Sequence, residues 1–231
     1  KTRLILMNTP GNTSGRVLNL EELQMIADTC LKFGLIAIVD EIYEQIWYGE
    51  NRHISLASLP DMYDRTVTLS GLGKTYGITG WRVGWAVASA PLTALIRKVH
   101  DYLTVCAPTL LQEAGRVALS LPNDYYVKMR ENYSKRRQIL LNALSTAGFL
   151  FKPPQGAYYV LVDFSPFGWT DDRSFVNFLA RKVGIIAVPG SSFYSGSGGN
   201  TKIRLNFAKK EETLNQAANC LLKANLYAKT N

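Results

Sequence analysis

Cysteine and histidine are scarce in this chain, which limits the chemistry that it can carry. The 231 residues include three cysteines, Cys30, Cys106 and Cys220, and two histidines, His53 and His100. An odd number of widely spaced cysteines does not make a disulfide framework, and neither residue type recurs at the spacing of a zinc site. We therefore expect no metal site, and we expect a reducing compartment such as the cytoplasm.

Long hydrophobic runs are also missing. No window of about eighteen apolar residues occurs, so we expect no membrane-spanning helix. The apolar run after Lys1–Arg3 is too short for the core of a signal peptide. Apolar residues still make up 47% of the chain and charged residues 19%, which is typical of a globular protein with a substantial core.

Acidic residues are outnumbered by basic ones. The chain has 26 lysines and arginines against 18 aspartates and glutamates, which gives a formal net charge of +8. The basic residues are scattered, and their densest group, between residues 128 and 137, also includes Glu131. We interpret this group as the solvated face of a helix, so no nucleic-acid partner is expected.

Strands and helices alternate in the first part of the sequence. A capping box at Asn19–Glu22 predicts the start of a helix, which should run to Phe33 and stop at Gly34. Short and almost wholly apolar strands are predicted around it, at Leu4–Met7, Ile36–Val39, Thr66–Leu69 and Trp85–Ala88. Such strands indicate an α/β fold with a mostly parallel sheet that is covered on both faces.

Helices dominate the middle of the chain, and the pattern then changes. Amphipathic segments follow Pro91 and Pro108, and a long helix is predicted from Tyr125 to about Ala147. Beyond it we expect a smaller α+β domain, with a flexible loop at Ser195–Gly199. Its predicted strands are Phe149–Lys152, Ala157–Val162, Ile185–Val188 and Lys202–Phe207, and its predicted helices are Arg173–Val183 and Glu211–Tyr227.

The most informative pair of residues is Lys74 and Arg82. Lys74 follows an apolar strand in a glycine-rich turn, and Arg82 lies between Gly80 and Gly84. A lysine in such a turn can attack a carbonyl carbon, and an arginine nearby can hold a phosphate through two hydrogen bonds. A phosphate-binding loop of nucleotide enzymes is excluded, because the position that needs its first glycine is Thr68. A surface lysine and a structural arginine remain the alternative at this stage.

Two further strand ends carry polar residues. A short strand leads into the turn that contains Asn12, and another ends on Asp40, with Tyr43 shortly after it. In open α/β sheets, ligands bind beyond the carboxyl ends of the strands. The sequence therefore predicts a ligand site that brings Asn12, Asp40 and Lys74 together.

Together, these segments resemble the class I and II, fold-type I aminotransferases, which use pyridoxal phosphate. The matching motifs are Asn12-Thr-Ser-Gly15, Asp40-Glu-Ile-Tyr43, the stretch from Ser70 to Gly84, and Lys202-Ile-Arg204-Leu-Asn-Phe207. The first motif departs from the family pattern, because Thr13 and Ser14 replace the usual Pro-Thr. The resemblance implies transfer of an amino group between an amino acid and a 2-oxo acid.

The resemblance also assigns roles to single residues. It implies that Lys74 forms the aldimine with pyridoxal phosphate and later moves the substrate proton. Asp40 would pair with the pyridine nitrogen, and Arg82 would bind the phosphate with help from Ser70. The remaining assignments are Asn12 and Tyr43 as partners of the phenolic oxygen of the cofactor, and Arg204 as the clamp for the substrate carboxylate.

In the family, the first matched motif lies well inside the polypeptide, so we expect this chain to be the C-terminal portion of a longer, homodimeric enzyme. The expected parts are the end of a large cofactor-binding domain (residues 1–90), linking helices (91–123), and a connecting helix with the small domain (124–231). Other pyridoxal phosphate chemistry, such as that of a C–S lyase or a cyclopropane-forming synthase, remains an alternative. A non-catalytic ligand-binding domain of aminotransferase type is another.

Overall fold

A computed structural model describes the backbone of residues 1–228 and the side chains of residues 1–224. The chain divides into two compact units. The first consists of residues 1–11 and 16–128, and the second of residues 12–15 together with the chain from residue 129 onward. The short segment 12–15, which contains Asn12, therefore belongs to the same unit as the C-terminal half of the chain.

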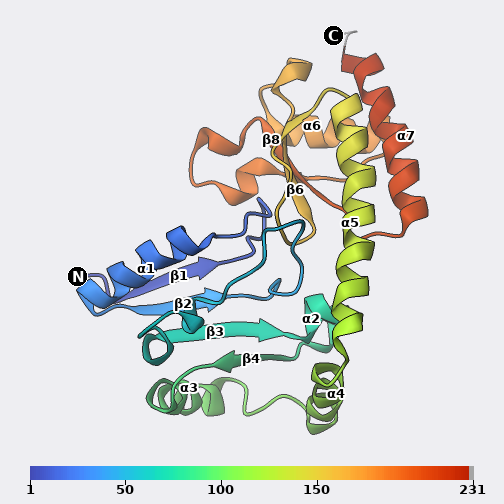
Figure 1. Cartoon of the computed structure of the whole chain (residues 1–231). Coiled ribbons are helices and arrows are strands. Elements are labelled where there is room, and N and C mark those ends of the chain that lie inside the picture. The colour runs from blue at the N-terminus through green and yellow to red at the C-terminus, as the bar shows by residue number, and fades with distance from the viewer. Residues whose placement is uncertain (229–231) are drawn as a thin grey trace. The chain divides into compact units, whose positions relative to one another are not determined.

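The first unit is built on a four-stranded sheet in the order β1-β2-β3-β4 (Figure 1). Its strands are β1 (Leu4–Asn8), β2 (Ile36–Asp40), β3 (Thr66–Gly71) and β4 (Gly84–Val87). The first three strands run parallel, and β4 is antiparallel to β3. All four predicted strands are thus present, and the carboxyl ends of β1, β2 and β3 meet at one edge.

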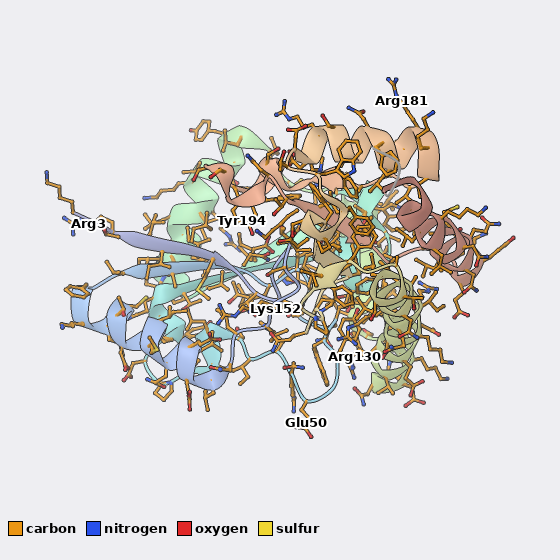
Figure 2. All side chains as sticks on the ribbon, turned by 90° about the horizontal axis from the view of Figure 1, so that it is seen from above. Arg3, Glu50, Arg130, Lys152, Arg181 and Tyr194 are labelled. Carbon is orange, nitrogen blue, oxygen red and sulfur yellow. The ribbon has the colours of Figure 1, made fainter. Side chains whose placement is uncertain are left out.

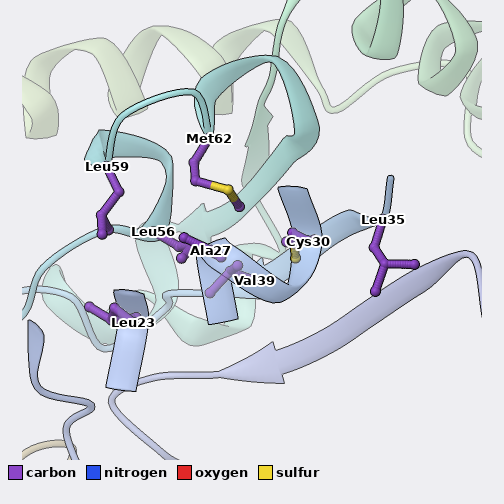
Figure 3. Close-up of a cluster of buried hydrophobic side chains, with 9 residues drawn as sticks. Leu23, Ala27, Cys30, Leu35, Val39, Leu56, Leu59 and Met62 are labelled. Carbon is purple, nitrogen blue, oxygen red and sulfur yellow. The ribbon is translucent and has the colours of Figure 1, made fainter. Parts of the chain in front are cut away.

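Helix α1 (Leu20–Phe33) covers one face of this sheet. The Asn19 side chain accepts a hydrogen bond from the Glu22 N–H, and the Glu22 side chain accepts one from the Asn19 N–H, so the predicted capping box forms. The helix ends at Gly34, whose φ of 63° suits a residue without a side chain. Figure 3 shows the resulting core, in which Leu23, Ala27 and Cys30 of the helix belong to one cluster with Val39 of β2.

The opposite face of the sheet is more open than the sequence suggested. Leu4 and Leu6, which point away from the α1 side, are 50% and 71% exposed. Their neighbours Ile5 and Met7 alternate with them and pack against the core below α1. Within the described residues, the α1 face of the sheet is therefore better covered by apolar side chains than the opposite face.

The remaining elements of the first unit are short turns and helices. The 3-10 turns are η1 (Leu56–Ser58), η2 (Tyr63–Arg65) and η3 (Thr79–Trp81). The helices are α2 (Leu72–Thr75), α3 (Ala90–Leu103) and α4 (Thr109–Leu119). Helix α5 (Asn123–Thr146) is the predicted long helix; it begins in the first unit and passes into the second after Lys128.

The second unit holds an antiparallel sheet in the order β5-β6-β8-β7. Its strands are β5 (Leu150–Phe151), β6 (Tyr159–Asp163), β7 (Val188–Pro189) and β8 (Lys202–Asn206). Its helices are α6 (Asp172–Phe178), which continues as the π-helical turn η5 (Leu179–Val183), and α7 (Glu211–Ala228). The 3-10 turns η4 (Ser165–Phe167), η6 (Gly190–Phe193) and η7 (Ser197–Gly199) complete it.

Two predictions for this unit need correction. The strand expected at Ile185–Val188 pairs only from Val188 to Pro189, because Ile185 and Ala187 are buried by packing rather than by strand pairing. The segment Ser195–Gly199, expected as a flexible loop, contains the turn η7. Gly199 is buried there, and a Cβ on it would lie 2.5 Å from the carbonyl carbon of Gly190, so close packing defines this segment.

In Figure 2, Arg3 and Glu50 of the first unit and Arg181 of the second extend outward from their elements. Among the described residues, no group of three or more acidic, histidine or cysteine side chains could hold a metal ion. In the same part of the chain, every helix is too short or too polar to cross a bilayer.

Candidate active site

The carboxyl ends of β1 and β2 are tied together around Asp40. Asn8 and Asp40 are register partners, and the Asn8 side-chain amide donates a 2.8 Å hydrogen bond to the Asp40 carbonyl oxygen. The Thr9 N–H donates to the same oxygen at 3.1 Å. The Asp40 carboxylate accepts the Ile42 N–H at 3.0 Å. These bonds hold the half-buried Asp40 side chain at the strand end, where the sequence predicted it.

Lys74 lies just beyond the next strand end, in the short helix α2. Its Nζ is 5.9 Å from the centroid of the Tyr43 ring, and Tyr43 is 1% exposed. An ammonium group over an aromatic ring at this distance is held by the quadrupole of the ring. The structure therefore brings together two residues that the sequence placed in one site, Lys74 from α2 and Tyr43 from the segment after β2.

The position of Arg82 is set by the close pairing of β3 with β4. A Cβ on Gly71 would lie 2.8 Å from the Val83 carbonyl oxygen, and one on Gly84 would lie 2.8 Å from the Ser70 carbonyl oxygen. Only glycines allow the two strands to approach in this way. The Arg82 backbone has a φ of 57°, and its Nη1 donates to the Thr79 carbonyl oxygen at 3.1 Å. The exposed guanidinium is thus anchored by the turn that precedes it.

Ser70 has a partner that the sequence did not suggest. Its hydroxyl donates a 2.8 Å hydrogen bond to the Glu44 carboxylate. Burial raises the pKa of Glu44, while the bond from Ser70 acts in the opposite direction. Ser70 remains a predicted phosphate ligand, but in this structure its hydroxyl is directed to a carboxylate.

In the second unit, Asn12 and Arg204 are joined. Arg204 lies in β8 between β6 and β7, and its Nη1 donates a 2.8 Å hydrogen bond to the side-chain oxygen of Asn12. The two residues are 192 positions apart in the sequence. The Gly15 carbonyl oxygen accepts the N–H groups of Gln155 and Gly156 at 2.8 and 2.7 Å, which fastens the segment of Asn12 to this unit.

The predicted residues thus form two groups, each within one unit. The first unit holds Asp40, Tyr43, Ser70, Lys74 and Arg82, and the second holds Asn12 and Arg204. Sequence reasoning missed the acceptor Glu44 and two aromatic partners of Arg204, Tyr159 and Phe193. No local pattern identifies these residues, because each contact joins two different elements that are brought together only by the fold.

Comparison with known proteins identifies the family. The model of the family "Aminotransferase class I and II" matches residues 1–221. A methionine aminotransferase of Escherichia coli is 38% identical over 218 residues, which are 94% of this chain and 56% of the relative. A kynurenine–oxoglutarate transaminase of Dictyostelium discoideum is 35% identical, with 96% of this chain and 57% of the relative covered. This chain therefore spans a little over half the length of these relatives.

Solved structures show the same similarity. An Escherichia coli protein with a methionine aminotransferase function superposes with a TM-score of 0.92 at 38% identity, covering 96% of this chain and 58% of the other. An aromatic aminotransferase of Pyrococcus horikoshii gives a TM-score of 0.91 at 32% identity, covering 99% and 61%. The α/β fold is therefore that of the fold-type I enzymes. By family match, sequence identity and structure, the chain belongs to the class I and II aminotransferases.

Proposed function

We propose that this chain carries the reactive lysine and the carboxylate-binding arginine of a pyridoxal phosphate-dependent aminotransferase. The enzyme would move an amino group between an amino acid and a 2-oxo acid. The observation that carries this proposal is Lys74, which lies over the Tyr43 ring at the edge of the sheet where β2 ends on Asp40.

The residues of the first unit have the chemistry that pyridoxal phosphate requires. The cofactor carries an aldehyde, a pyridine nitrogen, a phenolic oxygen and a phosphate, and it supplies electron withdrawal from the substrate α-carbon. In the proposed site, the Lys74 amine would bond to the aldehyde, the Asp40 carboxylate would accept the pyridine N–H, and Arg82 would bind the phosphate. Tyr43 would donate to the phenolic oxygen, with Asn12 as the second partner.

Lys74 would also act as the base of the reaction. Once its amine is free, its Nζ would take the proton from the substrate α-carbon and hold it for the return step of the amino-group transfer. A base of this kind must be held within hydrogen-bond reach of the carbon that it serves. The short helix α2 and the ring of Tyr43 supply that restraint.

Arg204 would select the substrate through its α-carboxylate. A guanidinium can form two parallel hydrogen bonds with a carboxylate, which fixes the orientation of the amino acid as well as its position. The names of the relatives include methionine and kynurenine aminotransferases. Others are named as aspartate aminotransferases, so we infer an amino acid as the donor and a 2-oxo acid as the acceptor, with a homodimer as the working form. The three free thiols of Cys30, Cys106 and Cys220 support a cytoplasmic enzyme.

Borohydride labelling tests the proposal directly. The chain is mixed with pyridoxal phosphate, reduced and digested, and the modified peptide is identified by mass spectrometry. The expected result is one modified site at Lys74, which is lost in Lys74→Ala and kept in the control Lys202→Ala. Modification of many lysines, or of none, in a folded sample would reject a competent site in this chain. Repeating the labelling on a longer polypeptide with the part of the relatives that this chain does not span would then test the role of Lys74 itself.

A further inference from the structure

Arg204 contacts two aromatic rings that come from different elements of the second unit. Its Cζ lies 4.2 Å from the centroid of the Tyr159 ring and 4.7 Å from that of the Phe193 ring. Tyr159 begins β6, the strand next to β8, and Phe193 ends the turn η6. Attraction between a cation and a ring acts within about 6 Å, so both contacts stabilise the guanidinium in its observed place.

The ring contacts leave hydrogen-bonding capacity unused. A guanidinium has five N–H donors in one plane. Nη1 of Arg204 donates to Asn12, and within the described part of the chain no acceptor is bound to its Nε or Nη2. An arginine restrained by rings and by one amide therefore keeps the edge formed by Nε and Nη2 available. That edge matches the two oxygens of a carboxylate.

The turn that carries Phe193 is itself fixed. The Asp172 carboxylate is 2% exposed and accepts the Ser191 N–H at 2.6 Å. At the start of the same turn, a Cβ on Gly190 would lie 2.4 Å from the Gly199 carbonyl oxygen, so η6 and η7 are in close backbone contact. A buried acceptor and a close backbone contact restrict the turn, and with it the position of the Phe193 ring.

We propose that Tyr159 and Phe193 are positioning residues for Arg204, and that Asp172 holds the turn of Phe193 in place. The two rings fix the orientation of the guanidinium before the ligand arrives, so that its free edge meets a carboxylate without a search among side-chain conformers. This preorganisation should increase the affinity for the carboxylate, because the conformational entropy of the arginine side chain is lost on folding instead of on binding. This inference rests on the proposed function, in which Arg204 binds the substrate carboxylate.

Nuclear magnetic resonance of the arginine side chain tests the proposal in the full chain without cofactor. Protons over an aromatic ring resonate upfield of their usual position, so the Arg204 Nε–H signal reports the rings directly. Propionate serves as the probe, since it is a carboxylate that cannot react with an aldehyde. We expect Phe193→Leu and Tyr159→Leu to move the Nε–H signal downfield and to weaken propionate binding at Arg204 by about two- to thirtyfold.

Conservative variants separate positioning from folding. Phe193→Tyr and Tyr159→Phe keep the rings and should restore the signal and the affinity. The matched control is Tyr194→Leu, because Tyr194 is adjacent to Phe193 but its ring lies 5.5 Å from the Lys202 ammonium. Asp172→Asn weakens the acceptor for Ser191 and should broaden the Arg204 signal.

The proposal is overturned if the leucine variants leave the Arg204 signal and its response to propionate unchanged. It is also overturned if propionate does not perturb Arg204 in the unmodified chain, because the edge would then not be available. Labelling of Lys74 is a separate measurement. If labelling fails on the longer polypeptide as well, the proposed role of Lys74 is rejected, whereas the measured effect of the two rings on Arg204 still stands.

Discussion

The imidazole Nε2 of His53 lies 2.9 Å from the carboxylate of Glu41, and the two side chains are 7% and 1% exposed. The Ser55 hydroxyl donates to the other carboxylate oxygen at 2.9 Å. Glu41 is the residue after Asp40, and its N–H donates to the Leu69 carbonyl oxygen at 2.8 Å. This buried network therefore fixes the backbone at the residue that follows Asp40, the proposed cofactor-binding carboxylate.

We predict that Glu41→Gln lowers the free energy of unfolding by about 1–3 kcal/mol. The glutamine amide carries no charge, and only its oxygen can accept a hydrogen bond. One of the donors that now bind the Glu41 carboxylate would therefore lose its acceptor. Glu50→Gln is the matched control, because Glu50 is exposed and lies on the same loop (Figure 2); it should change stability by less than about 0.5 kcal/mol. Urea denaturation measures both, and equal effects would mean that the network contributes little.

A cluster of three tyrosines joins the lysine-bearing helix α2 to the start of α5. The Tyr76 and Tyr126 hydroxyls are 2.9 Å apart, and the Tyr125 hydroxyl donates to the Thr75 carbonyl oxygen at 2.8 Å. The Tyr76 and Tyr125 rings are stacked, with centroids 5.8 Å apart. Burial, followed by the hydrogen bond with Tyr126, raises the pKa of Tyr76, and burial also raises the pKa of Tyr125.

The cluster should make stability fall at alkaline pH. A pKa that is higher in the folded state than in the unfolded state contributes stability below the unfolded value, near pH 10, and this contribution is lost as the pH rises further. We expect Tyr76 and Tyr125 to ionise above the ordinary tyrosine value of about 10, as followed by absorbance at high pH. Tyr126→Phe should lower the pKa of Tyr76, whereas Tyr102→Phe should not. Unchanged ionisation of Tyr76 in Tyr126→Phe would contradict the role of the hydrogen bond.

Local signals in the sequence predicted the strands and the capped helix of the first unit, but not the open face of its sheet. The capping box at Asn19, the stop at Gly34 and the apolar strands act through neighbouring residues, and the structure contains them as predicted. Strands in the second unit were less predictable. Ile185 has the side chain of a strand residue, but β7 starts only at Val188, because pairing with β8 depends on a partner far along the chain.

The candidate site shows the same division. Motifs pointed to Lys74, Asp40 and Arg204, since each follows or lies within a recognisable strand. The pairing of Arg204 with Asn12 and the bond from Ser70 to Glu44 could not be read from motifs. Contacts of this kind depend on tertiary packing, which no single-sequence periodicity encodes.

Glu44 should make stability depend on pH in the acidic range. Burial raises its pKa, so its protonated form is favoured by folding. The associated stability is complete below the ordinary glutamate value of about 4.3, and it is lost as the pH rises through the higher folded value. We predict that Glu44→Gln removes this loss and flattens the dependence of unfolding free energy on pH above about 4.3, because an amide does not ionise.

Ser70→Ala should raise the pKa of Glu44 further, and so strengthen the pH dependence that Glu44→Gln removes. The reason is that the hydroxyl bond favours the ionised carboxylate. Carboxyl resonances of Glu44, followed by nuclear magnetic resonance against pH, measure the change. Ser58→Ala is the control, because the Ser58 hydroxyl donates to the Ser55 carbonyl oxygen and not to a carboxylate. A Glu44 titration that is the same in Ser70→Ala and in the unmodified chain would contradict this account.

Gly71→Ala tests whether the close approach of β3 and β4 positions the residues around Lys74. The new Cβ would lie 2.8 Å from the Val83 carbonyl oxygen and 3.0 Å from the Gly84 Cα, and backbone atoms cannot yield as a flexible side chain would. We expect a loss of about 1–3 kcal/mol in unfolding free energy. Gly80→Ala is the matched control in the same segment, because no atom lies within 4 Å of its Cβ position, and it should leave stability nearly unchanged. If the strands can separate at low cost, both variants will unfold at the same urea concentration. In that case, close pairing with β4 would not be what holds the turn of Lys74 and Arg82 in place.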